Sequence, residues 1–175
     1  HGLNPDAALG DFDSVTEADR ERIRAAAGRM IAVDAVDKDW TDTEMAFNYA
    51  VSLGVKEIVI FGGLGTRFDH SLANVHLLAR AADLGLVCRV EDDHNRVQLV
   101  CGGQRLEVRR DRFPYVSLLP LTAEVTGIDL HGFQYPLADA VLRLGESLGI
   151  SNRLVAPTGS VSCRSGRLLV IGSRD

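Results

Sequence analysis

The stretch Gly10-Asp11-Phe12-Asp13-Ser14 sets two carboxylates two residues apart, directly after the apolar Ala7-Ala8-Leu9. Residues two apart on an extended backbone point to the same side, so the side chains of Asp11 and Asp13 would converge on one point. Mg²⁺ is the first candidate for a cation there, because one or two carboxylates usually hold it and substrate phosphates and water complete its shell. Alone, the pattern is more typical of a solvated Asp-rich turn capped by Ser14, so its meaning depends on the rest of the chain.

Composition limits the class of protein. The chain has 175 residues, of which 46% are hydrophobic, enough for the core of one large domain or two small ones. Its net charge of −5 argues against nucleic acid as the main partner, since a phosphate backbone binds a basic face. No apolar run approaches the roughly 20 residues that cross a bilayer. Cys88, Cys101 and Cys163 have neither metal-pair spacing nor an even disulfide count, which favours a reducing compartment, so we expect a cytoplasmic protein without a membrane partner.

Strand and helix signals alternate through the first half of the chain. Ser14-Val15-Thr16-Glu17 and Thr41-Asp42-Thr43-Glu44 have the spacing of capping boxes, which predicts a helix start at each. Short apolar runs precede the second box and the glycines that begin at Gly62, and they indicate buried parallel strands. The alternation predicts an α/β domain with a parallel sheet. The predicted elements are a helix over 18–27, a strand over 29–33, a helix over 42–53, a strand over 55–61 and a helix over 69–83.

A second acidic cluster follows the strand predicted over 29–33. Ligands of open α/β sheets bind at the carboxyl ends of the strands, so Asp39 and Asp42 join the candidate cation site. Thr41 has a structural role as a helix cap, and the helix dipole would stabilise Asp42 in the first turn whatever its function. A purely structural role therefore stays open for both residues.

Gly62-Gly63-Leu64-Gly65 stands between a predicted strand and a predicted helix, an order that offers backbone N–H groups and a positive helix end to a phosphate. The segment matches neither the Walker A loop, whose Lys is missing, nor G-x-G-x-x-G. Arg67 supplies a fork of donors suited to phosphate oxygens. Asp69 can join a cation site or cap the helix, and His70 can orient a phosphate or be structural. Helical spacing predicts the core face of this helix as Leu72, Val75, Leu78, Ala79 and Ala82.

Short β-type runs replace this alternation after Gly85 and predict a second, β-rich domain. The predicted boundary divides the chain into an α/β domain over 1–87 and a β-rich domain over 88–175. Asp92-Asp93-His94-Asn95 and Gly102-Gly103 are predicted turns, the second a two-residue hairpin, whereas 138–148 is compatible with a helix or with turns. The predicted strands cover 86–90, 97–101, 106–108, 115–121 and 167–171, with further β structure over 127–137.

Two segments of the second half are candidates for binding an organic ring. Phe133 and Tyr135 stand two residues apart, and Ser151-Asn152 follows a Gly-Ile turn. Aromatic faces beside amide and hydroxyl groups can hold a flat cationic ring. Sheet packing and an ordinary turn explain the same residues, so both interpretations stay open.

Taken together, these motifs resemble the thiamine pyrophosphokinase (thiamine diphosphokinase) family over nearly the whole chain. The resemblance lies in the order and spacing of Asn4-Pro5-Asp6, Gly10-Asp11-Phe12-Asp13-Ser14, Asp39-x-Thr41-Asp42-x-Glu44, Gly62-x-x-Gly65-x-Arg67-x-Asp69-His70 with Asn74, Gly132 to Leu137, and Ser151-Asn152. It implies an N-terminal α/β nucleotide-binding domain with a parallel sheet that binds Mg-ATP, and a C-terminal β-sandwich. It also implies a homodimer that holds thiamine between one subunit's nucleotide domain and the other's sandwich.

The sequence departs from the family pattern at two places. Family members usually begin with a further strand and helix, including an Ala-Asp-Gly motif, before the position of Gly10. The resemblance therefore implies that the 1–87 domain is N-terminally incomplete. Tyr135 stands where some relatives carry Trp, a change that keeps a ring available for stacking.

The implied reaction transfers a diphosphoryl group from ATP to the hydroxyl of thiamine and releases AMP. The implied ligands of one or two Mg²⁺ ions are Asp11, Asp13 and Asp42, and the implied catalytic residues are Asp42, Arg67 and Asp69, with Asp69 or Asp42 as the base. ATP would contact Asp11, Asp13, Ser14, Asp39, Thr41, Arg67 and His70. Thiamine would contact Ser151, Asn152 and a ring of Phe133 or Tyr135.

Two other functions stay open. A diphosphokinase that acts on another alcohol, such as a hydroxymethylpterin, would share the phosphate-side residues and differ only in the sandwich-side pocket. A catalytically silent nucleotide-binding module would bind ATP without transferring any group.

Overall fold

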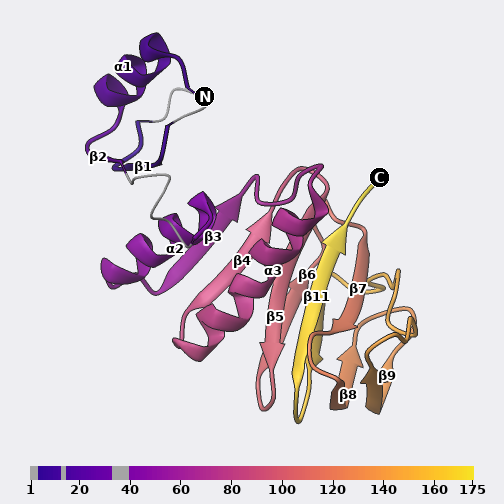
Figure 1. Cartoon of the computed structure of the whole chain (residues 1–175). Helices are drawn as coiled ribbons and strands as arrows, with labels where there is room; N and C mark the ends of the chain where they lie inside the picture. Colours follow the sequence, from indigo (N-terminus) through magenta and orange to yellow (C-terminus); the bar gives the residue numbers. More distant parts are fainter. Residues whose placement is uncertain (1–3, 13–14, 33–39) are drawn as a thin grey trace. The chain divides into compact units, whose positions relative to one another are not determined.

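The computed structural model describes residues 4–12, 15–32 and 40–175, and divides the chain into two compact units, His1–Val55 and Lys56–Asp175 (Figure 1). The first unit is a small α/β layer and the second contains most of the strands. None of the helices in the described part of the chain has the length and apolar content that crossing a bilayer requires.

The first unit is built on a parallel strand pair. Strands β1 (Ala8–Gly10) and β2 (Met30–Ala32) pair in parallel, with helix α1 (Glu17–Ala26) between them in the chain, and helix α2 (Asp42–Ser52) contacts β1. The capping box that begins at Ser14 does not cap α1. The N-cap is Thr16, whose side chain accepts the Asp19 N–H at 3.2 Å. The predicted cap of α2 is confirmed by the Thr41 hydroxyl, which accepts the Glu44 N–H at 3.2 Å.

The second unit begins with a strand, helix, strand arrangement. Strand β3 (Glu57–Phe61) pairs in parallel with β4 (Val87–Glu91), and helix α3 (Phe68–Asp83) joins them and lies on β4 and β5 (Asn95–Cys101). β4 and β5 form an antiparallel hairpin around the predicted Asp92–Asn95 turn, in which the Asp92 N–H donates to the Asn95 carbonyl at 2.9 Å. The sheet is therefore continuous across the predicted 87/88 boundary, which stays a prediction.

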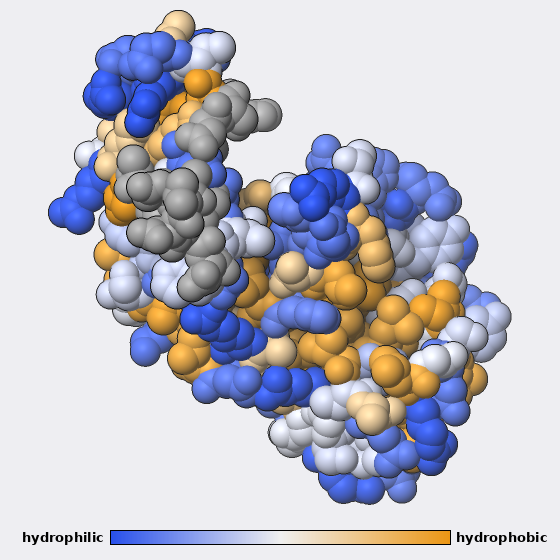
Figure 2. All heavy atoms as spheres, viewed as in Figure 1, coloured by the Kyte–Doolittle hydropathy of each residue, from blue (hydrophilic) through white to orange (hydrophobic). Residues whose placement is uncertain are grey.

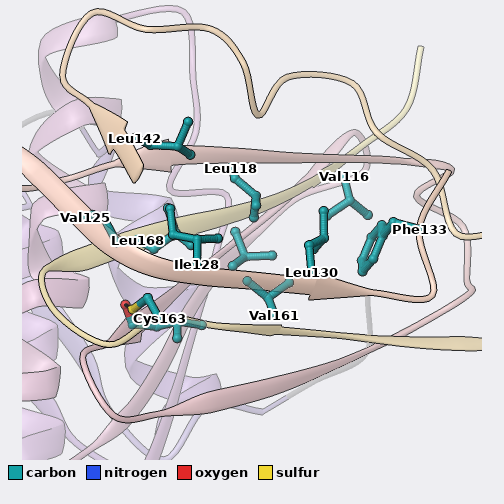
Figure 3. Packing of buried hydrophobic residues seen from close by; sticks show 12 residues of the cluster. Val116, Leu118, Val125, Ile128, Leu130, Phe133, Leu142, Val161, Cys163 and Leu168 are labelled. Carbon is teal, nitrogen blue, oxygen red and sulfur yellow. Dashed lines mark hydrogen bonds between the residues drawn. The ribbon is translucent and has the colours of Figure 1, made fainter. Parts of the chain in front are cut away.

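Two sheets pack face to face to form the C-terminal β-sandwich, as predicted. The five-stranded sheet has the order β3-β4-β5-β11-β7 and the four-stranded sheet the order β6-β10-β8-β9. Their facing side chains form one buried cluster that includes Leu118 and Leu168 from the first sheet and Leu130 and Val161 from the second (Figure 3). The remaining strands are β6 (Arg105–Arg109), β7 (Tyr115–Pro120), β8 (Glu124–His131), β9 (Leu137–Arg143), β10 (Thr158–Ser162) and β11 (Arg167–Ser173).

The Gly102-Gly103 turn does not make the predicted hairpin. The turn itself is present, since the Gln104 N–H donates to the Cys101 carbonyl at 2.9 Å, but β5 and β6 belong to different sheets. β6 pairs instead with β10, a strand that we did not predict because its Thr-Gly-Ser-Val-Ser sequence has a single large apolar residue. The ambiguous 138–148 segment continues β9 to Arg143 and then turns, with Gly145 in a left-handed conformation.

The buried face of α3 differs from the predicted one. Leu72 is 40% exposed, which contradicts its assignment to the core, whereas Leu78 is fully buried as predicted. The buried residues of the helix are Ser71, Asn74, Leu77, Leu78 and Ala81. The buried positions are thus shifted by one residue from most of the predicted ones, and two of them, in the first turns of the helix, carry polar side chains.

Candidate active site

The first unit brings Asp42 next to the residue that precedes Asp11. Gly10 ends β1 and is buried, and Asp42 is the first residue of α2. The Asp42 Oδ1 atom lies 3.9 Å from the place where a Cβ atom on Gly10 would stand. The carboxyl end of a strand and the positive end of a helix thus meet at this point, which is where α/β sheets bind ligands.

The described part of the chain holds no group of three His, Cys, Asp or Glu side chains close enough to share a metal ion. The predicted metal ligands Asp11 and Asp42 are both described, and both carry a carboxylate, the kind of group that Mg²⁺ prefers. Asp13, Ser14 and Asp39 lie outside the described residues.

In the second unit, the glycine turn is shaped by close packing and by hydrogen bonds to its backbone. Gly62 has a φ of +69°, and its N–H donates to the carbonyl of Glu91 at 3.3 Å. A Cβ atom on Gly63 would lie 2.9 Å from Ile60 Cγ2 and 3.0 Å from Val90 Cγ1. A side chain at Gly63 would therefore collide with β3 and β4, whereas at Gly62 the left-handed φ alone disfavours a side chain.

Two buried polar side chains of α3 hold the same loop. The Gly65 N–H donates to the Ser71 hydroxyl at 2.9 Å, and the Asn74 side-chain amide donates to the Gly63 carbonyl at 2.8 Å. The Gly65 N–H, one of the backbone groups that this order of elements could offer to a phosphate, is thus engaged within the protein. We did not predict Ser71; the signal in the sequence is a pair of polar residues at i and i+3 among apolar ones.

Arg67 and Asp69 form an ion pair at the start of α3. The Arg67 Nη2 atom lies 2.6 Å from Asp69 Oδ2 and its Nε atom lies 3.3 Å from Oδ1, so the guanidinium grips the carboxylate with two donors. The hydrogen bond from Arg67 lowers the pKa of Asp69 below its usual value. Both side chains are exposed, as is His70 in the same turn.

Asp69 does not cap the helix. Arg67 is the N-cap residue of α3 and makes no side-chain cap hydrogen bond, while Asp69 lies in the first helical turn and pairs with Arg67. The N-terminus of α3 therefore carries a negative side chain, Asp69, in its first turn and a positive one, Arg67, at its N-cap.

On the sandwich, the structure brings Tyr135 and Asn152 together. The buried Asn152 side chain donates to the Tyr135 carbonyl at 2.7 Å and accepts the Tyr135 N–H at 3.1 Å. Its backbone pairs with Val116 of β7, the edge strand of the five-stranded sheet, and its Oδ1 atom also accepts the Arg153 N–H at 2.9 Å. Asn152 therefore holds the Tyr135 backbone in place through two hydrogen bonds.

The two predicted ring partners lie in different environments. Phe133 is 3% exposed and its ring lies beside Val116 and Leu130 in the sandwich core (Figure 3), which leaves it no free face for a ligand. Tyr135 is 64% exposed. Ser151 is exposed, has a φ of +59° and donates its N–H to the Ser117 hydroxyl at 3.0 Å.

Comparison with known proteins accounts for both halves of the chain. The family model described as thiamin pyrophosphokinase, catalytic domain, matches residues 1–89, and the model described as thiamin pyrophosphokinase, vitamin B1 binding domain, matches residues 103–168. The thiamine pyrophosphokinase of Bacillus subtilis (strain 168) is 36% identical over 174 residues, which cover 99% of this chain and 81% of that protein.

Solved structures agree with this match. The crystal structure of thiamine pyrophosphokinase from Bacillus subtilis aligns with a TM-score of 0.91 at 35% identity, over 99% of this chain and 81% of that one. The crystal structure of thiamin pyrophosphokinase from Geobacillus thermodenitrificans aligns with a TM-score of 0.85 at 34% identity, over 98% and 78% of the two chains. The chain therefore belongs to the thiamine pyrophosphokinase family.

Proposed function

We propose that this chain transfers the diphosphoryl group of Mg-ATP to the hydroxyl of thiamine, forming thiamine diphosphate and AMP. The observation that carries the proposal is the 36% identity, over 99% of the chain, to a thiamine pyrophosphokinase. The matches to both a catalytic and a vitamin B1 binding domain support it, because a reaction between a nucleotide and thiamine needs both kinds of surface.

Asp11, Asp13 and Asp42 hold the Mg²⁺ of Mg-ATP in this proposal. The approach of the Asp42 carboxylate to the Gly10 backbone supports it, because that position adjoins Asp11. Bound there, Mg²⁺ would neutralise charge on the triphosphate. Ser14, Asp39 and Thr41 lie in the same two segments of the sequence and would contact the nucleotide.

Arg67 binds the phosphates and opposes the charge that grows on the transferred group. Its guanidinium is already oriented by the two-donor contact with Asp69. The two-donor contact lets Asp69 orient Arg67, and either Asp69 or Asp42 takes the hydroxyl proton. His70, exposed in the next position, contacts the nucleotide.

Tyr135 and Ser151 form the thiamine side of the site. The exposed ring of Tyr135 packs on a thiamine ring, and the Ser151 hydroxyl hydrogen-bonds the aminopyrimidine. Asn152, whose amide is engaged with the Tyr135 N–H and carbonyl, holds the backbone that carries this ring. The buried Phe133 packs the sandwich beneath this segment.

A homodimer is also part of the proposal, and an apolar sheet face supports it. Leu99, Leu169 and Leu119 are aligned across β5, β11 and β7, at positions that alternate with residues of the sandwich core. Leu99 and Leu119 keep part of their surface exposed, and Figure 2 shows hydrophobic side chains gathered on the viewed face of the second unit. A second copy would bury such a surface.

Release of AMP from ATP, measured with Mg²⁺ in the presence and absence of thiamine, tests the proposal. We expect AMP and thiamine diphosphate to form in equal amounts and only when thiamine is present. A hydroxymethylpterin tested in its place identifies the rival diphosphokinase. Thermal stabilisation by Mg-ATP without any AMP release would instead identify a silent nucleotide-binding module and overturn the proposal.

A further inference from the structure

The buried face of α3 is polar in its first turns and apolar beyond them. Ser71 is 9% exposed and Asn74 is 7% exposed, and they are followed on the same face by Leu77, Leu78 and Ala81. Ser and Asn are weak helix formers, and a buried polar group is costly unless it is hydrogen-bonded. These two side chains are hydrogen-bonded to the loop that precedes the helix.

The two side chains contact alternate residues of that loop. The Ser71 hydroxyl accepts the Gly65 N–H at 2.9 Å and lies 3.2 Å from the Gly65 carbonyl and 3.1 Å from the Arg67 carbonyl. Its single proton can be donated to only one of these carbonyls at a time. Asn74 donates to the Gly63 carbonyl at 2.8 Å. The loop is thus held at residues 63, 65 and 67 from one helix face.

Gly65, in the middle of the loop, has open space on the side where a side chain would stand. A Cβ atom at Gly65 would meet no other atom within 4 Å, whereas one at Gly63 would collide with side chains of β3 and β4. No contact on that side holds Gly65, whereas both of its backbone groups reach Ser71.

The position of the Arg67 side chain depends on the same backbone. Its guanidinium is exposed, and it grips Asp69, which stands only two residues further on. Because the ion pair is local, it orients the guanidinium but does not tie it to the rest of the unit. The contacts of Ser71 with the Arg67 carbonyl, through its hydroxyl and through its N–H at 3.1 Å, supply that tie.

We infer that Ser71, assisted by Asn74, is a positioning residue that holds the Gly63–Arg67 loop so that Arg67 meets the triphosphate. The inference rests on the proposed function. A purely structural role for Ser71 would stabilise the fold without a specific effect on the nucleotide, and the two roles differ in measurable ways.

Ser71→Ala tests the inference, because Ala removes the hydroxyl while favouring the helix. We expect the KM for Mg-ATP to rise about tenfold, the factor that corresponds to roughly one hydrogen bond, with the KM for thiamine changed less than about twofold. Ser71→Thr keeps a hydroxyl that can reach the carbonyl four residues back and should restore most of the loss. Ser160→Ala, at a buried serine of β10, is the matched control and should leave both KM values unchanged.

A double-mutant cycle separates positioning from folding. If Ser71 acts through Arg67, then adding Ser71→Ala to Arg67→Ala should change kcat/KM for Mg-ATP by less than about twofold. Equal losses in the wild-type and Arg67→Ala backgrounds would overturn the inference, as would a normal KM for Mg-ATP in Ser71→Ala.

Hydrogen exchange of the Gly65 amide, followed by NMR, tests the contact without any activity. We expect exchange about tenfold faster in Ser71→Ala than in wild type, because the Gly65 N–H loses its acceptor. Unchanged exchange would overturn the positioning role. A wild-type protein that releases no AMP would refute the proposed function, and the exchange result would still decide whether Ser71 holds the loop.

Discussion

Glu91→Gln should strongly destabilise the second unit, although it only replaces one carboxylate oxygen with an amide nitrogen. Glu91 lies at the end of β4 and is only 7% exposed. Its carboxylate accepts from Arg96 Nε at 2.8 Å, from Arg112 Nη2 at 2.8 Å, and lies 3.4 Å from Arg89 Nε. The Gln side chain keeps the shape but places an uncharged amide, with one N–H₂ group, against three guanidinium groups.

The magnitude follows from the two close contacts that carry charge. Hydrogen bonds to charged groups contribute about 1.5–3 kcal/mol each, and the retained amide oxygen preserves part of them, so we expect a loss of about 3 kcal/mol. With a typical slope of about 2 kcal/mol/M, the urea midpoint measured by far-UV circular dichroism should fall by about 1.5 M. Glu57→Gln is the matched control, because Glu57 also pairs with Arg89 but is exposed, and it should cost about 0.5 kcal/mol or less.

The pH dependence of this difference has a definite sign. Hydrogen bonding from Arg96, with a further contribution from Arg112, lowers the pKa of Glu91 in the folded protein. The stabilisation is therefore complete above the unfolded pKa of about 4.3 and is lost as the pH falls through the lowered folded value. The gap between wild type and Glu91→Gln should be full at neutral pH and shrink in acid. Equal midpoint shifts for Glu91→Gln and Glu57→Gln would refute the reasoning.

Three further predictions concern the proposed site and the proposed dimer. Asp42→Asn should reduce thiamine-dependent AMP release by about a hundredfold or more, because the Mg²⁺ that neutralises the triphosphate loses a carboxylate ligand; normal turnover would contradict the role. Asn152→Ala should cost about 3 kcal/mol in urea unfolding, since three hydrogen bonds are lost and the Tyr135 backbone is left without them, and the KM for thiamine should rise; an unchanged KM would disconnect Asn152 from the substrate. Leu119→Glu should yield monomers in light scattering at concentrations where wild type and the exposed-site control Leu144→Glu are dimers; a dimeric Leu119→Glu would exclude this sheet face.

Local patterns predicted the elements that depend on a few neighbouring residues. Thr41 caps α2 because a hydroxyl at that position reaches the N–H three residues on, whatever the rest of the chain does. Before α1 the sequence offers two hydroxyl residues, Ser14 and Thr16, as possible N-caps, and Thr16 is the one that caps the helix. The strand, helix, strand order of 57–91 could also be predicted locally. Glycines separate the apolar run of β3 from the helical spacing of α3, and α3 from the apolar run of β4.

Pairing between distant strands was not readable in this way. The turn at Gly102-Gly103 is local and was predicted, but the partner of β6 is β10, about fifty residues later in the chain. Whether two strands joined by a tight turn stay in one sheet depends on which faces their apolar residues bury, and that is decided by the assembled core.

By itself, the sequence determined the α/β order of the first half, the β-rich second half, and the acidic and arginine-containing segments that follow strand ends, because caps, turns and periodicities act over a few residues. Only the tertiary structure decided that Ser71 and Asn74 face the glycine loop, that Phe133 belongs to the core, and that Tyr135 is exposed. The physical reason is that the exposure of a side chain depends on the elements packed against it, and those elements come from distant parts of the chain.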